Sequence, residues 1–158
     1  MHASLALLLA FAIGIVAGLR SMTAPAVTAW AAHLGRLNLQ NSALAFMGSK
    51  WTAGIFTLAA LGELVADKLP MTPARTKPGP LAGRIVMGGL CGGCVAVAAD
   101  GAVWLGTFAG GIGAFVGAFA GYRVRKGLVQ SLRLRDSLIA VAEDLIAIGL
   151  GVWLVTRL

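Results

Sequence analysis

Long runs of apolar residues, which few charges interrupt, constrain this chain more than any motif does. The runs at 4–24, 102–122 and 137–156 are close to the ~20 residues that an α-helix needs to cross a bilayer. Charged residues make up only 12% of the chain, against roughly 25% in ordinary globular domains. The apolar residues do not alternate with polar ones, which argues against a transmembrane β-barrel. The sequence therefore predicts an all-α, polytopic transmembrane helical bundle that forms one integral membrane domain over residues 1–158.

Five membrane spans are predicted. Pro25 follows the first span and removes a helix donor, so a break is expected just past Arg20, with a short interfacial helix over 26–34. The prolines of the linker 70–83 exclude a helix there. Asp100 with Gly101 is a turn signal that favours a helical hairpin, although one bent helix with a buried aspartate is an alternative. The five spans are 4–24, 51–67, 85–99, 102–122 and 137–156.

Basic residues orient these spans, because cytoplasmic loops carry an excess of lysine and arginine. A cytoplasmic N-terminus and a periplasmic C-terminus place nine basic residues in the cytoplasm and four outside. The four tryptophans then all fall at the outer boundary, as an aromatic belt requires. The nine cytoplasmic residues are Lys68, Arg75, Lys77, Arg84, Arg123, Arg125, Lys126, Arg133 and Arg135.

A short element occurs twice in the chain. Each copy is a small-residue helix face that runs into an arginine, and with five spans the two copies run in opposite directions. This predicts an inverted repeat, an architecture that many transporters share. The matching pairs are Gly14 with Gly117, Ala17 with Ala120, Gly18 with Gly121 and Arg20 with Arg123.

Glycines recur at helical spacing along the fourth predicted span and place one small-residue face there. In lipid such faces let helix backbones approach closely, so we expect them to pack against neighbouring helices. The glycines of this face are Gly106, Gly110, Gly113, Gly117 and Gly121.

Ionisable residues inside the spans are the candidates for a functional site. Each costs ~2.5–3.5 kcal/mol near the bilayer centre, so such residues pair or line a polar cavity. We expect Arg123 to lie within salt-bridge reach of an acid on the inner side, and Arg20 to pair with Asp100 on the outer side. The cluster could bind a cation, shuttle protons or hold an anionic headgroup, or it could be a set of structural ion pairs. Its candidate members are Arg20, Glu63, Asp67, Asp100, Arg123, Glu143 and Asp144.

The sequence offers no sign of a metal site, a cofactor or an enzyme. Cys91 and Cys94 have the spacing of a redox pair, but they lie within an apolar run and are expected to act as small core residues. The histidines, His2 and His33, are far from the cysteines in this layout. The net charge of +7 is explained by the orienting loops, so no nucleic-acid partner is expected.

Three charged segments carry a resemblance to a known family. They are Gly18-Leu19-Arg20-Ser21, the run from Glu63 to Pro70 (ELVADKLP), and Glu143-Asp144-Leu145-Ile146-Ala147. The chain resembles a family of small bacterial inner-membrane proteins that is known only as a domain of unknown function. The resemblance implies an α-helical protein of the bacterial inner membrane, and it implies no activity or substrate.

Two functional classes remain open. One is a small transporter-like or channel-like protein with a charged intramembrane site, which buried ionisable residues favour. The other is a non-transporting structural or lipid-binding module, whose basic loops hold anionic headgroups of membrane lipids. Five spans enclose little volume, so a transporting unit is expected to be a homo-oligomer.

Overall fold

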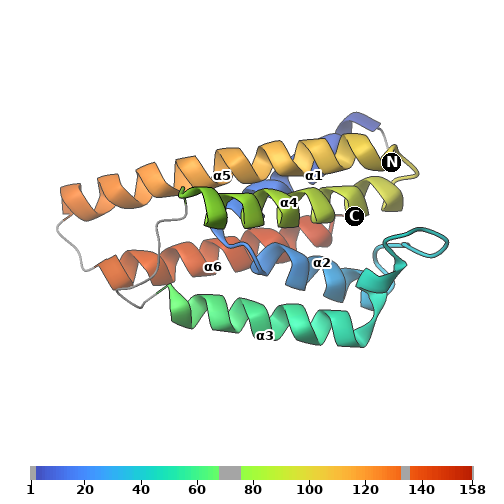
Figure 1. Ribbon diagram of the computed structural model, residues 1–158, viewed down its shortest axis with the longest axis horizontal. Coiled ribbons are helices and arrows are strands. Elements are labelled where there is room, and N and C mark those ends of the chain that lie inside the picture. The colour runs from blue at the N-terminus through green and yellow to red at the C-terminus, as the bar shows by residue number, and fades with distance from the viewer. Residues whose placement is uncertain (1–2, 68–75, 133–135, 158) are drawn as a thin grey trace.

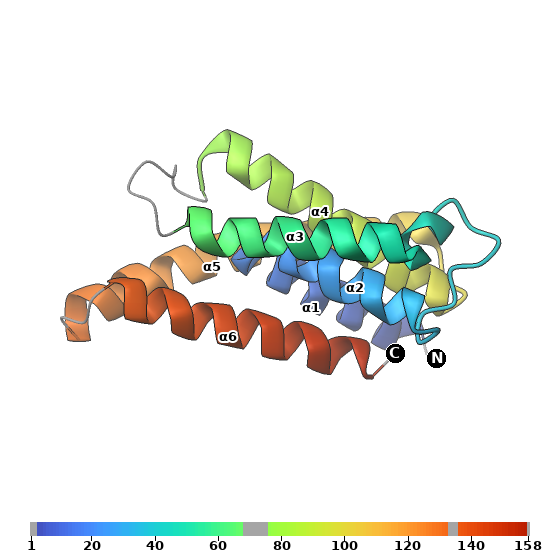
Figure 2. The same ribbon diagram turned by 90° about the horizontal axis from the view of Figure 1, so that it is seen from below.

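The computed structural model describes residues 3–67, 76–132 and 136–157, with the backbone alone at 132 and 136–138. Within these residues the chain is all-helical, as expected, with six α-helices and one short 3-10 helix. The helices lie roughly along one axis, so the loops gather at the two ends of a bundle (Figures 1 and 2). The elements are α1 (Ala3–Leu19), α2 (Thr23–His33), η1 (Ala45–Gly48), α3 (Lys50–Ala66), α4 (Pro78–Ala98), α5 (Val103–Leu132) and α6 (Asp136–Val155).

The chain reverses direction between α1 and α2. Helix α1 ends at Leu19 and α2 begins at Thr23, so the predicted break past Arg20 is present. Pro25 lies in the first turn of α2, where its missing N–H is not needed and its fixed φ suits the helix. Helix α2 runs back along the bundle (Figure 1). The short helix predicted over 26–34 is therefore present, but it packs along the bundle as a sixth helical segment.

This reversal also determines where the two chain termini lie. With six helices in alternating directions, the N-terminus and the C-terminus lie at the same end of the bundle (Figures 1 and 2). The cytoplasmic N-terminus and periplasmic C-terminus stay a prediction, because the position of a membrane is needed to test them. We call the end with residues 20–22 the Arg20 end and the opposite end the tryptophan end.

Helices α1 and α5 run in the same direction, which does not fit an inverted repeat of the arginine elements. Along their contact, Gly14 of α1 meets Gly110 of α5, and one turn later Gly18 meets Gly117. Residue numbers on both helices increase from the first contact to the second, which happens only between parallel helices. The expected antiparallel relation depended on two spans between the two copies. The returning helix α2 makes the number of intervening helices three, so the two copies are parallel.

Glycines let α1, α4 and α5 pack with their backbones in contact, as the sequence predicts. A Cβ built on Gly113 or Gly117 would overlap the main-chain oxygens of Phe11 and Ile15 in α1. On its other side, α5 meets α4, where a Cβ on Gly110 would overlap the main-chain oxygen of Gly88. Such close backbone approach requires residues without a Cβ. The glycine face of α5 is therefore used within the bundle.

Asp100 forms the turn of a tight helical hairpin between α4 and α5. Its φ of 54° is left-handed, and the N–H of Gly101 bonds to the carbonyl of Ala96 at 2.8 Å, as in a helix C-terminus closed by a left-handed residue. The hairpin prediction is confirmed, and the alternative of one bent helix is wrong.

Two helix boundaries differ from the predicted spans. Helix α4 begins at Pro78, because prolines are well tolerated in a first helical turn; the prediction of a non-helical linker up to residue 83 is wrong for this part. Helix α5 continues to Leu132, and its last turns project beyond the other helices at the Arg20 end (Figure 1). The predicted end at residue 122 marks the end of the apolar run, not of the helix.

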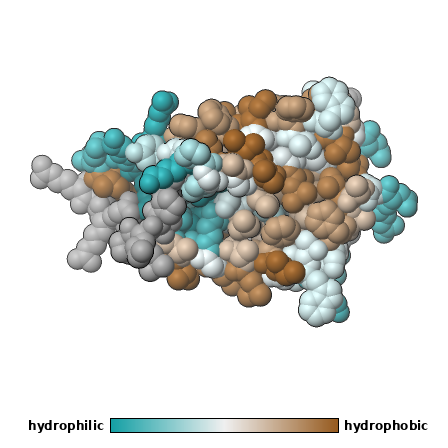
Figure 3. Space-filling model, in the orientation of Figure 1, coloured by the Kyte–Doolittle hydropathy of each residue, from teal (hydrophilic) through white to brown (hydrophobic). Residues whose placement is uncertain are grey.

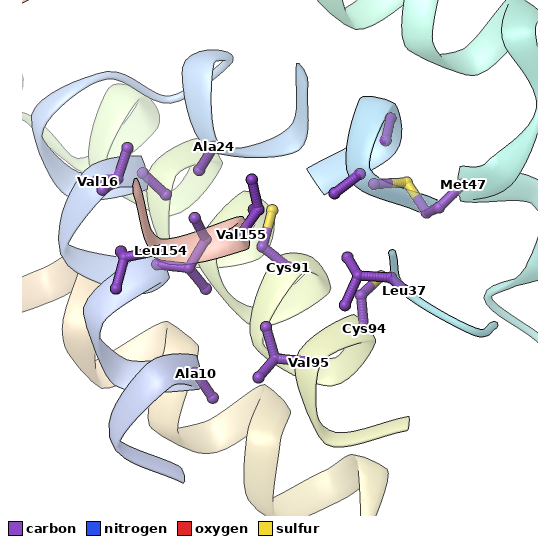
Figure 4. Close-up of a cluster of buried hydrophobic side chains, with 14 of the residues drawn as sticks. Ala10, Val16, Ala24, Leu37, Met47, Cys91, Cys94, Val95, Leu154 and Val155 are labelled. Carbon is purple, nitrogen blue, oxygen red and sulfur yellow. The ribbon is translucent and has the colours of Figure 1, made fainter. Parts of the chain in front are cut away.

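The apolar core lies where α1, α2, α4 and α6 meet. Ala10, Val16, Cys91 and Val95 belong to one cluster of buried side chains (Figure 4). Cys91 and Cys94 are both free and buried, in the packing position that the sequence predicts.

The surface is apolar along the middle of the bundle and polar at its ends, with the larger polar area at the Arg20 end (Figure 3). Two helices of the described residues, Pro78–Ala98 and Val103–Ser131, are long and apolar enough to cross a membrane, and Ala3–Leu19 is a shorter apolar helix. Trp30, Trp51, Trp104 and Trp153 stand on the helix turns nearest the tryptophan end, each more than two-fifths exposed. These features are consistent with a bilayer around the bundle.

Candidate functional site

Arg20 occupies the centre of a buried charge cluster at the turn between α1 and α2. Its side chain is fully buried, and its Nη1 lies 2.6 Å from Oδ2 of Asp67 at the end of α3. Its Nη2 forms a second ion pair with Oδ1 of Asp144 on α6. One guanidinium therefore joins three parts of the chain that are far apart in sequence, and it pairs with two carboxylates that the bundle largely removes from water.

Glu63, one turn before the end of α3, caps the start of α2. Its Oε1 accepts hydrogen bonds from the N–H of Ser21 at 2.9 Å and from the Ser21 hydroxyl at 2.8 Å. Its Oε2 accepts one from the N–H of Met22 at 2.9 Å. Met22 itself provides no side-chain cap, so Glu63 supplies the negative charge that a helix N-terminus favours.

Arg84, in the second turn of α4, closes the other side of the same turn. Its Nη1 donates to the carbonyls of Gly18 at 3.1 Å and Leu19 at 2.9 Å. These are among the last carbonyls of α1, which have no partner within their own helix. Its Nη2 lies 3.4 Å from Oε1 of Glu63. Arg84 thus holds the end of α1 and the carboxylate at the start of α2 together.

Glu143 lies at the edge of this cluster and pairs with Arg125 of α5, at 3.7 Å. Arg123, which we expected to hold one of these acids, is exposed. The salt bridges between described residues do not include it. The expected pairing of Arg123 is wrong, because two residues along an α-helix point about 200° apart and only one of Arg123 and Arg125 can face α6.

The expected pair of Arg20 with Asp100 is also wrong. Asp100 is exposed in the α4–α5 turn, at the tryptophan end, whereas Arg20 is at the other end of the bundle. The error follows from the course of α2. Once α2 is a returning helix, Arg20 moves to the side where Glu63, Asp67 and Asp144 lie.

Sequence reasoning missed two parts of the cluster, Arg84 and the turn residues Ser21 and Met22. Arg84 directly precedes the apolar run that begins at Ile85, and the predicted span 85–99 leaves it in a loop. Prolines at the first and third positions of a helix could have signalled that the helix starts before this arginine. The amides of Ser21 and Met22 become donors only because α1 ends beside them, which side-chain chemistry cannot indicate.

The cluster as described contains two arginines and three acids, namely Arg20, Arg84, Glu63, Asp67 and Asp144. With all groups ionised its sum is +2 − 3, or −1. Replacing buried ion pairs by apolar residues of similar volume is often neutral or stabilising, so stability alone gives little reason for such a cluster.

The fold and this centre define an all-helical protein with apolar faces and a buried ionic cluster at a helix break. The chain belongs to the family described as domain of unknown function DUF4126, whose family model matches residues 7–157. This agrees with the resemblance in its charged segments. No curated protein and no solved structure matches the chain.

Proposed function

We propose that this chain is an integral membrane protein of the transporter-like or channel-like class, and that the charge cluster around Arg20 is its solute site. The observation that carries the proposal is the position of Arg20, which is fully buried at a break between two helices and bridges α3 and α6. Broken helices place their polar ends at the substrate sites of many transporters. Charged residues inside membrane segments mark such sites by default.

The charges give the proposed orientation. The described basic residues Lys77, Arg84, Arg123, Arg125 and Lys126 belong to the Arg20 end, which favours a cytoplasmic position for that end. The tryptophans belong to the opposite end, which favours the outer interface. Both chain termini are then outside the inner membrane, and only α1 is inverted relative to the sequence-based orientation.

The second candidate is a non-transporting structural or headgroup-binding module. It is supported by the pairing of the acids, since Glu63, Asp67, Glu143 and Asp144 all have partners. It is also supported by the projecting end of α5, where Arg123 and Lys126 are exposed and suit contact with anionic lipid headgroups. If the chain is a transporter, the structure with these acids paired represents a closed state of the site. A small bundle of this kind would then work as a homo-oligomer.

Water access to the cluster distinguishes the two candidates. A cysteine at Ser21, next to Arg20, should react with a small membrane-impermeant thiol reagent from both sides of the membrane if the cluster is a transport site. Reaction from the Arg20 side alone supports headgroup binding, and no reaction from either side supports a structural clamp. The native chain, with its two buried cysteines, is the unreactive control, and Gln130→Cys on the exposed end of α5 is the reactive one.

A further inference from the structure

We propose that the start of α2 is a binding site for a small oxyanion, a carboxylate or a phosphate, and that Glu63 occupies it as a tethered substitute. This inference rests on the proposed function and names the class of its solute. It assigns to Glu63 the role of a competitor for the anion within the site.

Four donors from two elements converge on the carboxylate of Glu63. The N–H groups of Ser21 and Met22 lie 2.9 Å from it, the Ser21 hydroxyl lies at 2.8 Å, and Nη2 of the buried Arg84 lies at 3.4 Å. Main-chain N–H groups at a helix start, together with a guanidinium, form a general oxyanion site. These donors contact only the carboxylate group of Glu63 and not the rest of its side chain. A free oxyanion of the same size therefore fits the same place.

A fifth donor in the same turn stands without an acceptor. Nε of Arg20 is buried and has no hydrogen-bond partner within the described part of the chain. Arg20 directly precedes Ser21, and its Nη1 is 3.5 Å from the main-chain oxygen of Glu63. Buried donors are nearly always satisfied by protein, water or a ligand. The turn thus holds one more donor than Glu63 and the neighbouring acids use, and a phosphate, with more oxygens than a carboxylate, can supply an acceptor.

The charges around Glu63 make it a competitor for the anion. The described groups near it are Arg20, Arg84, its own-helix neighbour Asp67, and Asp144 across Arg20. A free anion that entered while Glu63 stayed in place would add a further negative charge to a cluster whose described groups already sum to −1. Removal of the Glu63 charge should therefore favour the binding of a free oxyanion.

Chemical rescue tests the site directly. Glu63→Ala removes the tethered carboxylate and lowers the thermal midpoint (Tm) of the purified protein. Acetate or inorganic phosphate should restore it saturably, by about 3–6 °C at ten times the Kd, whereas chloride at equal ionic strength should not. In Glu63→Ala/Arg84→Gln the rescue should be lost. Rescue that is equal for chloride, or that persists without Arg84, overturns the proposal.

A second variant guards against misfolding of Glu63→Ala. Glu63→Gln keeps the size of the side chain and removes the charge that competes with a free oxyanion. At a fixed pH, phosphate should therefore raise the Tm of Glu63→Gln more than it raises the Tm of the native protein. An equal effect on both proteins would show that Glu63 does not occupy the oxyanion site.

The source of the oxyanion and the proposed function are separated by two further measurements. If Glu63→Ala is stabilised in nanodiscs of phosphatidylglycerol and not of phosphatidylcholine, the phosphate comes from a lipid headgroup; stabilisation by soluble phosphate in both identifies a free anion. If acetate or phosphate rescues Glu63→Ala but Ser21→Cys is not labelled from both sides, the oxyanion site is supported and the transport function is contradicted. If Ser21→Cys is labelled from both sides but neither anion rescues Glu63→Ala, the transport function is supported and the oxyanion site is contradicted.

Discussion

Arg20 and Asp144 form a buried ion pair across 124 positions of sequence, and the same guanidinium holds Asp67. This relationship ties the α1–α2 turn to both α3 and α6. It is the point at which the helices that carry the acids are fixed relative to the helix break. The stability of the bundle and the chemistry of the candidate site therefore depend on one arginine.

The first prediction concerns this pair. Arg20→Gln should destabilise the protein by about 3–5 kcal/mol, because it leaves two buried carboxylates without a counter-charge. Adding Asp144→Asn should recover part of the loss, since it removes one of these charges. A double-mutant cycle on unfolding in detergent measures this coupling. Arg36→Gln, at an exposed arginine of the tryptophan end, is the matched control and should stay within about 0.5 kcal/mol of the native protein. Additive effects of Arg20→Gln and Asp144→Asn would refute the pair.

The second prediction compares two neighbouring arginines of α5. Arg125→Gln should couple to Glu143→Gln by about 0.2–1 kcal/mol, the usual range for a partly exposed ion pair. Arg123→Gln should be additive with Glu143→Gln, because Arg123 faces away from α6. The same unfolding measurement applies. Coupling of Arg123 and not of Arg125 would mean that α5 is rotated from the position described above.

The third prediction uses two glycines of one helix. Gly117→Ala places a methyl group against the main chain of Ile15, and it should force α1 and α5 apart and lower the Tm. At Gly127 an added methyl group meets nothing within 4 Å, so Gly127→Ala should stabilise the helix by roughly 0.5–1 kcal/mol. Thermal unfolding of the two variants is the test. A neutral Gly117→Ala would show that the two backbones are not in contact.

The fourth prediction is topological. Single cysteines at Ala3 and Thr156, both exposed, should be labelled by an impermeant reagent from the same side of the membrane, the outside. Gln130→Cys should be labelled from the cytoplasm. The native cysteines are buried and give the background. Labelling of Ala3→Cys together with Gln130→Cys would restore the five-span topology and leave α2 as an interfacial helix.

Much of the fold can be predicted from the sequence, because it depends on properties of local segments. Apolar runs between Ala3 and Val155 indicate helices wherever they occur, and the turn at Asp100 is determined by two adjacent residues. The glycine spacing from Gly106 to Gly117 predicts a packing face by periodicity alone. These features need no knowledge of which segments meet.

For the candidate site, the sequence predicts which residues belong to it but not how they pair. Glu63, Asp67, Asp144 and Arg20 were recognisable because a charge in an apolar run has a cost that requires a partner. The sequence does not predict the partner of each charged residue, because the pairing depends on the direction of every preceding helix. The predicted pair of Arg20 with Asp100 is wrong for this reason.

The sequence by itself determined that this chain is all-helical, that its helices pack through glycine, and that a few buried charges must find partners. The tertiary structure alone decided that the chain turns back at Ser21, that α1 and α5 are parallel, and that Arg20 meets Asp67 and Asp144. The physical reason is that apolar periodicity and the cost of a charge belong to single segments. An ion pair between α1 and α6 exists only when all the intervening helices have been placed.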